Sequence, residues 1–569
     1  MDFNVSRRQQ IGSWWNPRRD DLAVSKNILA GRLDLSPHPT WEFGESIDWS
    51  ADPFSQRNWR FQLHSMRWLD PVRRVALSDG EFSQQCKEFW CEAVFDWSDQ
   101  FLQGNDEYAW MDMADGLRAI EMVLGAPIVP DTNLQTFEGI LTEHLQRLSD
   151  LERRVAGNHG LHQIQGMLVA AAFLEDHQTL QDSLCQLKEL FFSEYDSQGT
   201  NREGSLAYHD LNFHWWKSAA ERVHAEGLDF SECDDLLRKS RSNLMHFVRP
   251  DGFLETIGDT APERPLSVDA YDFTSYAQSG GEIGVPPAET QKVLNGGFIA
   301  GRSSWGTDPE TFKSSTFYTL RFGREAIHGH DDGGSITLFS RYPWIVDPGM
   351  YAYQRHPMRN YFKGRSAHNT VESSDPKYFA GSTVLVNAYS DAQYDWYELK
   401  TSTSTTGELT RWVVYLKRFD VFFVLDRLSD DSAPEFGIGF WQNWHFMPET
   451  RVEVGLRTVV LMHNGDSATL RWLNRPQFRT VSGEEAPLKG WYSPRYGESV
   501  PTTVLEVAPR EPAPNEWFVA VSLAQDDVVP IRYWFEDDYR AIQFKVDEKM
   551  YLVDLTNGQA PSLLAEEVL

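Results

Sequence analysis

The sequence is poor in cysteine, with four among 569 residues. Cys86, Cys91, Cys185 and Cys233 make no CxxC pair, so neither a disulfide framework nor a cysteine-based zinc motif is expected. The sequence also has no run of 18 uncharged apolar residues, which excludes a membrane-spanning helix and the membrane as a partner. The N-terminal stretch lacks the apolar segment of a signal peptide. We therefore expect a cytoplasmic protein, or a periplasmic or secreted one if a leader was removed.

Basic residues are also scarce, since 53 Lys and Arg face 83 Asp and Glu, giving a net charge of −30. This balance argues against nucleic acid as a partner, because phosphate binding needs a concentrated basic surface. It leaves an anionic sugar polymer open, because a local cluster of cations in a cleft can hold a polyanion. Aromatic residues make up 13% of the chain. They can stack on sugar rings or fill large cores, and their spacing favours cores.

Apolar residues recur at helical spacing from about Glu81 to about Phe247. One stripe, from Leu134 through Leu141 to Leu148, follows the start signal of Pro130. Sequential helices joined by short loops suggest antiparallel pairs that can close into an α/α toroid. The expected helices cover residues 81–102, 109–124, 131–148, 160–174, 179–195, 210–225 and 234–248.

Beyond about Asn295 the pattern changes to short β-branched and aromatic segments separated by turn residues. The length also requires more than one core. The predicted fold is therefore α+β and multidomain, an N-terminal α/α toroid followed by an antiparallel β-sandwich. The expected strands are 296–302, 316–322, 335–340, 412–416, 421–425, 532–535 and 541–546. The expected domains are an N-terminal segment 1–75, a toroid 76–287, a sandwich 288–489 and a C-terminal β-unit 490–569.

Polar side chains capable of catalysis crowd four segments where a packed core would not need them. These segments are GNHG at 157–160, EGSLAYH at 203–209, HGHDD at 328–332, and the stretch from VDPG at 346 to AHNT at 367–370. In these motifs the chain resembles the heparinase II/III-like superfamily of polysaccharide lyases. Further similar segments are 47–49, 59–64, 109–118 (which includes Asp112) and 490–497.

The resemblance implies β-elimination, in which the proton at C5 of a uronate is removed and the 4-linked oxygen is expelled. This reaction needs a group that neutralises the carboxylate, a base and an acid. Asn158, assisted by His159, corresponds to the neutraliser. Asn158 could instead cap a helix, but capping explains the Asn without the His. Asn158, Tyr208 and His328 are expected to flank one cleft where the toroid meets the sandwich.

Tyr208 corresponds to the family's acid, or to acid and base in turn. Because a free phenol has a pKa of about 10, a nearby cation or hydrogen-bond donor must make its proton mobile. His328 is the candidate base, and Tyr361 lies where related enzymes place a second tyrosine. His209 is a substrate-binding candidate, with a helix-start histidine bonded to backbone as the alternative.

The resemblance also implies a divalent metal ion, expected to be a structural zinc, on His330, Asp347 and His368. Two histidines and a carboxylate form a chemically suitable zinc set. Asp347 has an alternative explanation, because Asp-Pro-Gly is a turn sequence.

A basic stretch, Arg355, Arg359 and Arg365, lies near these motifs and is assigned to substrate binding, with a solvated loop as the alternative.

The predicted function is a polysaccharide lyase acting on a uronate polymer or oligosaccharide. A glycosaminoglycan such as heparan sulfate, chondroitin or hyaluronan is favoured, and alginate or a bacterial exopolysaccharide is the alternative. The anionic sugar is the expected partner, and a homo-oligomer is left open. The rival classes are a glycoside hydrolase using Glu203, Asp331 and Asp332, and a non-catalytic sugar-binding protein.

Overall fold

The computed structural model describes most of the chain and divides it into two compact units, residues up to Tyr195 with Asn212–Leu237, and Asp196–Leu211 with Arg238–Leu569. The described residues are 20–104, 106–111, 113–266, 275–323, 326–379, 381–404, 407–429, 439–509, 515–523, 528–535, 539–556 and 562–566. Asp112, in one of the segments with family resemblance, lies outside them. In the described part no helix is long and apolar enough to cross a membrane, and all four cysteines are free thiols.

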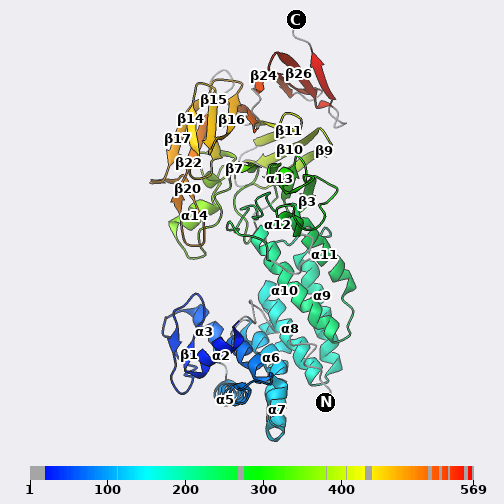
Figure 1. Cartoon of the computed structure of the whole chain (residues 1–569), viewed down its shortest axis with the longest axis vertical. Helices are drawn as coiled ribbons and strands as arrows, with labels where there is room; N and C mark the ends of the chain where they lie inside the picture. Colours follow the sequence, from blue (N-terminus) through cyan, green and yellow to red (C-terminus); the bar gives the residue numbers. More distant parts are fainter. Residues whose placement is uncertain are drawn as a thin grey trace. The chain divides into compact units, whose positions relative to one another are not determined.

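The N-terminal part of the chain is helical, as Figure 1 shows. Its helices match the predicted segments closely, and three shorter ones precede them. The helices are α2 Asp21–Leu29, α3 Arg57–His64, α4 Asp70–Ala76, α5 Ser83–Phe101, α6 Ala114–Gly125, α7 Leu134–Ser149, α8 Gly157–Phe173, α9 His177–Glu194, α10 Leu206–Ala225 and α11 Ser231–Met245.

Two glycines allow the central helices α6 and α8 to pack backbone against backbone. A Cβ added at Gly166 would lie 2.5 Å from the Cα of Gly116, and a Cβ at Gly116 would lie 2.3 Å from the His162 carbonyl oxygen. Any side chain at either position would therefore force the helices apart. Helix α7 buries the predicted stripe, including Leu141 and Leu148. This amphipathic pattern explains why the helix was predictable from sequence.

One small two-stranded sheet, Arg32–Leu33 with Trp41–Glu42, lies among these helices, and the remainder of the chain consists mainly of antiparallel strands and three short helices, α12 Ser275–Gln278, α13 Pro309–Lys313 and α14 Pro357–Lys363. The strands are β1 Arg32–Leu33, β2 Trp41–Glu42, β3 Gln291–Leu294, β4 Phe298–Arg302, β5 Thr316–Arg321, β6 Ile336–Ser340, β7 Tyr342–Ile345, β8 Val371–Ser373, β9 Thr383–Ser390, β10 Tyr394–Ser402, β11 Glu408–Leu416, β12 Val421–Ser429, β13 Phe440–His445, β14 Arg451–Val454, β15 Thr458–His463, β16 Asp466–Trp472, β17 Gln477–Ser482, β18 Glu484–Glu485, β19 Leu488–Lys489, β20 Trp491–Tyr492, β21 Val500–Pro501, β22 Thr503–Ala508, β23 Glu516–Ser522, β24 Val528–Phe535, β25 Arg540–Val546, β26 Lys549–Asp554 and β27 Ser562–Glu566.

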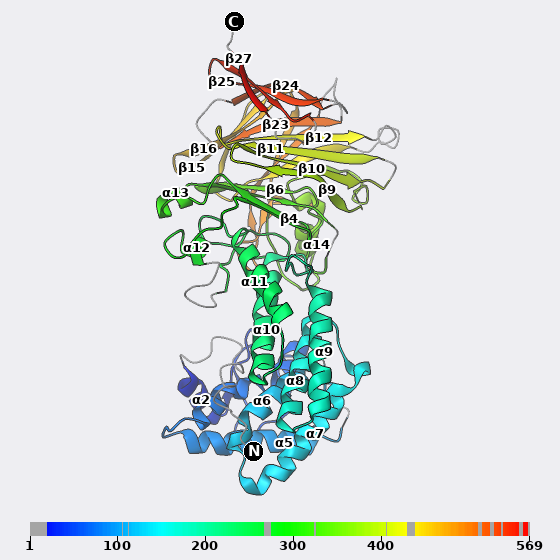
Figure 2. The same cartoon turned by 90° about the vertical axis from the view of Figure 1, so that its right-hand side faces the viewer.

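An eight-stranded sheet, ordered β14-β15-β16-β23-β12-β11-β10-β9, is the middle layer of the second unit. A five-stranded sheet, β3-β4-β5-β6-β7, and a four-stranded sheet, β17-β22-β13-β8, share the core on one of its faces. A second four-stranded sheet, β24-β25-β26-β27, packs on the other face (Figure 2). Within the predicted β-unit 490–569, β22 and β23 thus join the sandwich sheets, and the separate sheet begins at β24.

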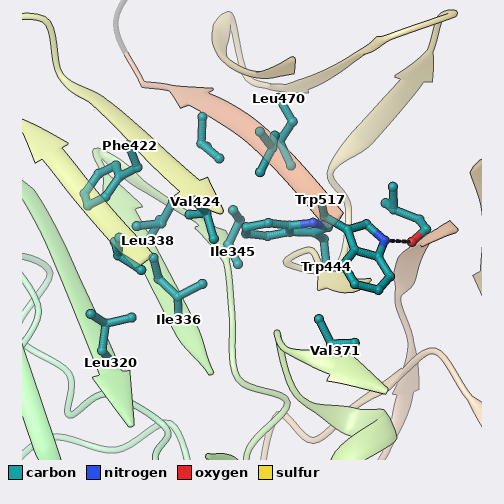
Figure 3. Close-up of a cluster of buried hydrophobic side chains, with 14 of the residues drawn as sticks. Leu320, Ile336, Leu338, Ile345, Val371, Phe422, Val424, Trp444, Leu470 and Trp517 are labelled. Carbon is teal, nitrogen blue, oxygen red and sulfur yellow. Dashed lines mark hydrogen bonds between the residues drawn. The ribbon is translucent and has the colours of Figure 1, made fainter. Parts of the chain in front are cut away.

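The alternation along β12 shows why both faces of the middle sheet are covered. Phe422 and Val424 belong to the core shared with the five-stranded sheet, whereas Val421, Phe423 and Leu425 belong to the core under the C-terminal sheet. Because successive side chains of a strand point to opposite faces, an unbroken apolar run fills two cores. Figure 3 shows the first core, where labelled side chains from several strands point into one interior.

The second core should depend strongly on Phe423, which is 1% exposed and has Phe518 and Phe544 as ring neighbours. Phe423→Ala removes those contacts and leaves a cavity, so it should lower the free energy of unfolding by about 3–5 kcal/mol. Chemical denaturation monitored by circular dichroism measures this. Ile531→Ala, at a position 40% exposed in the same region, is the control and should stay within about 0.5 kcal/mol. Equal losses for both variants would contradict the two-core arrangement.

Candidate active site

Three loops of the second compact unit, each carrying a glycine, meet closely around His328. The backbone N–H of His328 donates to the Glu203 carbonyl at 2.9 Å, and the N–H of Asp259 donates to the His328 carbonyl at 2.8 Å. Gly258 has φ +61°, and a Cβ there would lie 2.5 Å from the Gly204 carbonyl oxygen. Both the dihedral angle and this approach require glycine.

A buried carboxylate, Asp259, is the acceptor at the centre of these loops. Its oxygens accept hydrogen bonds from His328 Nδ1 at 3.0 Å and from His330 Nε2 at 3.0 Å. The Arg359 guanidinium donates to both oxygens, with Nη2 at 2.7 Å. Burial alone would raise the pKa of Asp259, but these hydrogen bonds outweigh it and hold the pKa well below its usual value. Asp259 is thus a fixed anion beside two histidines.

Tyr208 stacks directly on the predicted base. Its ring lies 3.4 Å from the His328 ring, centroid to centroid, with an interplanar angle of 10°. The Tyr208 hydroxyl shares a hydrogen bond with the Tyr353 hydroxyl. Burial raises the pKa of Tyr208, whereas the Tyr353 hydrogen bond and the Arg359 charge act to lower it. Tyr208 is therefore protonated, and the donor and cation that its role requires are both present.

The predicted metal ligands His330, Asp347 and His368 come together in one buried cluster. One ligand atom from each lies within 4.8 Å of the others, and their exposures are 3%, 2% and 0%. The three residues come from the loop before β6, the turn after β7 and the segment before β8. Folding thus joins three loops that are separate in sequence.

The donor set of this cluster fits a divalent metal ion. Among the described residues, His330 Nδ1 and His368 Nε2 are buried nitrogens that have no hydrogen-bond partner. Buried polar atoms are normally satisfied, so two such nitrogens near one carboxylate point to a ligand that would occupy them. Their other nitrogens bind carboxylates, since His330 Nε2 contacts Asp259 and His368 Nδ1 contacts Asp347 at 2.7 Å. Such hydrogen bonds orient metal-binding imidazoles, and of the two carboxylates only Asp259 lies outside the ligand set.

Asn158 and His159 lie in the first turn of α8, in the first compact unit, and both are half-buried. The N-cap of this helix is Ala156, and no side chain makes a capping hydrogen bond there. The capping explanation for Asn158 is therefore wrong. Its place beside Tyr208 and His328 at one cleft stays a prediction.

Some predicted site residues have contacts of a structural kind. His209 is 4% exposed, and its ring nitrogens contact the Asn201 N–H at 3.3 Å and the Ser240 carbonyl at 3.1 Å. These contacts fit the backbone-bonded alternative better than substrate binding. The Tyr361 hydroxyl accepts a hydrogen bond from the Gly490 N–H at 3.1 Å, and its ring packs in a buried cluster. The structure thus brings Tyr353, not Tyr361, to Tyr208.

The basic stretch divides into three environments. Arg355 is exposed, Arg359 is paired with Asp259, and Arg365 is buried. Arg365 donates to the Val371 carbonyl at 2.7 Å, so it ties the backbone after the metal-cluster segment. Of the three, only Arg355 fits the solvated-loop alternative.

Two residues of this site were not predicted from the sequence, Asp259 and Tyr353. Asp259 lies in a Gly-Asp-Thr loop, and its histidine partners are 69 and 71 residues away. Tyr353 follows the Asp347 turn by six residues and is 49% exposed. Tyr353 could have been considered because it lies beside the basic stretch that begins at Arg355. The sequence around Asp259 contains no motif that marks it as a site residue.

Comparisons with known proteins place the chain in a family. A model described as the heparinase II/III N-terminus matches residues 23–264, and one described as heparinase II/III-like, C-terminal, matches residues 319–530. Together they span most of the chain. The chain belongs to the heparinase II/III-like family, as its motifs predicted.

Curated relatives and solved structures agree with this placement. A heparin-sulfate lyase from Pedobacter heparinus is 21% identical over 546 residues, covering 86% of this chain and 78% of that protein. A heparin-sulfate lyase from Bacteroides stercoris is 22% identical over 389 residues, covering 58% and 56%. The structure of a mutant of the heparan sulfate lyase HepC from Pedobacter heparinus has a TM-score of 0.75 at 17% identity, covering 95% of this chain and 90% of that one. The predicted fold class, helical domain then β-sandwich, is confirmed.

The close approach of the three loops can be tested at Gly258. Gly258→Ala places a Cβ against the neighbouring backbone, so the melting temperature should fall and the site loops should separate. The matched control is Gly465→Ala, because Gly465 also has a positive φ (+93°) but nothing lies within 4 Å of an added Cβ. It should lose only about 1–2 kcal/mol from backbone strain. Differential scanning calorimetry compares the variants, and equal losses would refute the steric argument.

Proposed function

We propose that this chain cleaves a uronate-containing glycosaminoglycan of the heparan sulfate type by β-elimination. Its family membership makes it a polysaccharide lyase. The observation that carries the mechanism is the contact between Tyr208 and His328, two proton-transfer groups stacked ring on ring. Both curated relatives are named as heparin-sulfate lyases, which supports the heparan sulfate type over other uronate polymers.

Two proton movements are required, and the site has a group for each. Elimination breaks the C5–H and C4–O bonds, forms the C4–C5 double bond, and protonates the leaving oxygen without consuming water. His328 Nδ1 faces Asp259, which leaves Nε2 as the nitrogen able to take the C5 proton. Tyr208 is assigned as the acid that protonates the leaving oxygen.

The surroundings of Tyr208 suit that role. Once it has given up its proton, the phenolate gains from the Tyr353 hydrogen bond and from the nearby Arg359 charge. These groups are already in place before the reaction, so they need little reorganisation in the transition state. Asn158 remains the proposed donor to the uronate carboxylate, because an amide can bind that charge without taking part in proton transfer.

The glycoside hydrolase alternative is weaker. A hydrolase needs two carboxyl groups available to flank the scissile bond. Asp332 is buried and paired with Arg321 at 3.0 Å, and Asp331 lies 3.4 Å from Arg365. Glu203 lies 3.8 Å from His328 Nε2, beside an imidazole rather than a second carboxyl group. Asp331 and Asp332 thus form ion pairs with arginines instead of flanking a scissile bond.

A structural zinc ion on His330, Asp347 and His368 is part of the proposal. Two imidazole nitrogens and a carboxylate oxygen suit zinc, and the burial of all three suits a structural ion. When bound, the ion would balance the Asp347 charge and join three loops. The proton transfers are assigned to the protein's own side chains.

The product distinguishes the proposed reaction from hydrolysis. Incubation with heparan sulfate should raise ultraviolet absorbance, because elimination alone creates an unsaturated uronate. A panel with chondroitin sulfate, hyaluronan, alginate and a bacterial exopolysaccharide then ranks the substrates by initial rate. New reducing ends without absorbance would show a hydrolase, and no cleavage of any polymer would favour a binding protein.

Tyr208→Phe tests the acid. The change keeps the ring that stacks on His328 and removes only the transferable proton, so the turnover number should fall by about 10²–10⁴-fold. The melting temperature should change little. Tyr361→Phe is the matched control, since its hydroxyl binds backbone, and turnover should be nearly kept. Asn158→Ala should also lower turnover with little loss of stability. Near-normal turnover of Tyr208→Phe would remove Tyr208 from the mechanism.

Metal removal tests the zinc assignment. Elemental analysis of purified protein should find about one zinc per chain, and dialysis against a chelator should lower the melting temperature. His368→Ala should abolish zinc retention and lower stability as well as activity. Protein that retains no divalent metal, with a melting temperature insensitive to chelator, would exclude the site.

A further inference from the structure

The four donors to Asp259 are distributed evenly over its two oxygens. Oδ1 accepts from His330 Nε2 and Arg359 Nη1, and Oδ2 accepts from His328 Nδ1 and Arg359 Nη2. The Asp259 side chain is 0% exposed. Each oxygen thus serves one histidine and one arm of the guanidinium, with no access for solvent.

Asp259 connects the metal cluster with the Tyr208–His328 pair, which have separate roles in the predicted site. His330 belongs to the metal cluster, and His328 stacks on Tyr208. Because Asp259 accepts a hydrogen bond from the Nε2–H of His330, Nδ1 is the atom left to bind a metal ion. Because it also accepts a hydrogen bond from the Nδ1–H of His328, Nε2 is left for proton transfer. One carboxylate therefore selects the tautomer of both imidazoles.

We propose that Asp259 is a positioning residue shared by the metal cluster and the proton-transfer pair, holding His328, His330 and Arg359 in the orientations that each centre needs. The proposal deepens the lyase function and rests on it for the kinetic half of its test. The buried Asp259 side chain is not one of the three metal-cluster residues and offers no exposed atom to a substrate. It acts through the rings and the guanidinium that it binds.

The chemistry requires a carboxylate at this position, not merely a polar side chain of the same size. Asparagine has one acceptor oxygen and one NH₂ donor, so it can satisfy only one side of the arrangement. On the other side its NH₂ group would face the N–H of a histidine and an N–H of Arg359. All three groups are hydrogen-bond donors, so none of them would find an acceptor there. That imidazole would then turn or change tautomer. Asp259→Asn thus changes the orientation of the partners while keeping the volume.

The matched control is Asp395→Asn, which alters a buried carboxylate elsewhere in the same unit. Asp395 is 0% exposed and accepts from Tyr318 at 2.7 Å and from Lys417 at 3.0 Å. Like Asp259, it pairs with a cation inside the fold, but no histidine contacts it among its described hydrogen bonds. It reports the general cost of neutralising a buried carboxylate.

The experiment measures three quantities on wild type, Asp259→Asn, Asp259→Glu and Asp395→Asn. They are the turnover number and KM on heparan sulfate, the rate of zinc transfer to a chromophoric chelator, and the melting temperature. For Asp259→Asn we expect turnover to fall and zinc transfer to accelerate, each about 10–100-fold, the usual effect of losing an outer-shell partner. KM should change by less than about threefold, because no substrate contact is removed.

The controls separate positioning from stability. Asp395→Asn should lower the melting temperature while keeping wild-type turnover and zinc transfer. Asp259→Glu retains both oxygens and the charge, so it should fold and recover part of both losses even if Asp259→Asn does not fold. Wild-type rates in Asp259→Asn, or equal changes in Asp395→Asn, would overturn the proposal. If the wild type cleaves no polymer, the lyase function fails, but faster zinc transfer in Asp259→Asn alone would still support the positioning role.

Discussion

A buried negative charge is the constraint on which the site depends. A carboxylate removed from water is costly unless donors surround it, so the fold must bring enough of them to Asp259. It does so from distant parts of the chain, since His328 is 69 residues away and Arg359 is 100 residues away. The glycine-lined approach of the loops makes these contacts possible, because any side chain at Gly258 would keep the backbones apart. The geometry of the site therefore depends directly on the close packing of these loops.

Much of the fold could be predicted because its patterns are local. Helix α7 follows an amphipathic stripe, α8 is a long run buried over most of its length, and the central strands are short apolar runs bounded by turn residues, so period and length identify them. The helices α2, α3 and α4 were missed because they are only seven to nine residues long, too short for a helical stripe to repeat. The pairing of β23 with β12 and β16 could not be read from sequence either. Which strands become neighbours is decided by long-range packing, which leaves no periodic signal.

For the site, the motifs predicted which residues take part better than they predicted where each side chain points. His330, Asp347 and His368 gather as the family resemblance implied, and Tyr208 contacts His328. Tyr361, chosen from the same stretch of sequence, instead directs its hydroxyl to a backbone N–H. Tyr361 lies within α14, whereas Tyr353 lies in the loop before that helix, and the sequence did not show which of the two tyrosines reaches Tyr208. Asp259 could not be predicted from the sequence, because its role depends on His328, His330 and Arg359, which only the folded chain brings to it.

The charges around the site are largely balanced within the protein. Arg359 and Arg365 have carboxylate partners in Asp259 and Asp331, so the cations of this region are largely neutralised before any substrate arrives. The proton-transfer groups follow the same principle. Burial keeps the Tyr208 phenol protonated, and the Tyr353 hydrogen bond offsets part of the cost of ionising it. In the proposed mechanism the uronate meets neutral donors such as Tyr208, whose charge develops only during elimination, and stabilisation that grows with the reaction lowers the barrier instead of merely tightening substrate binding.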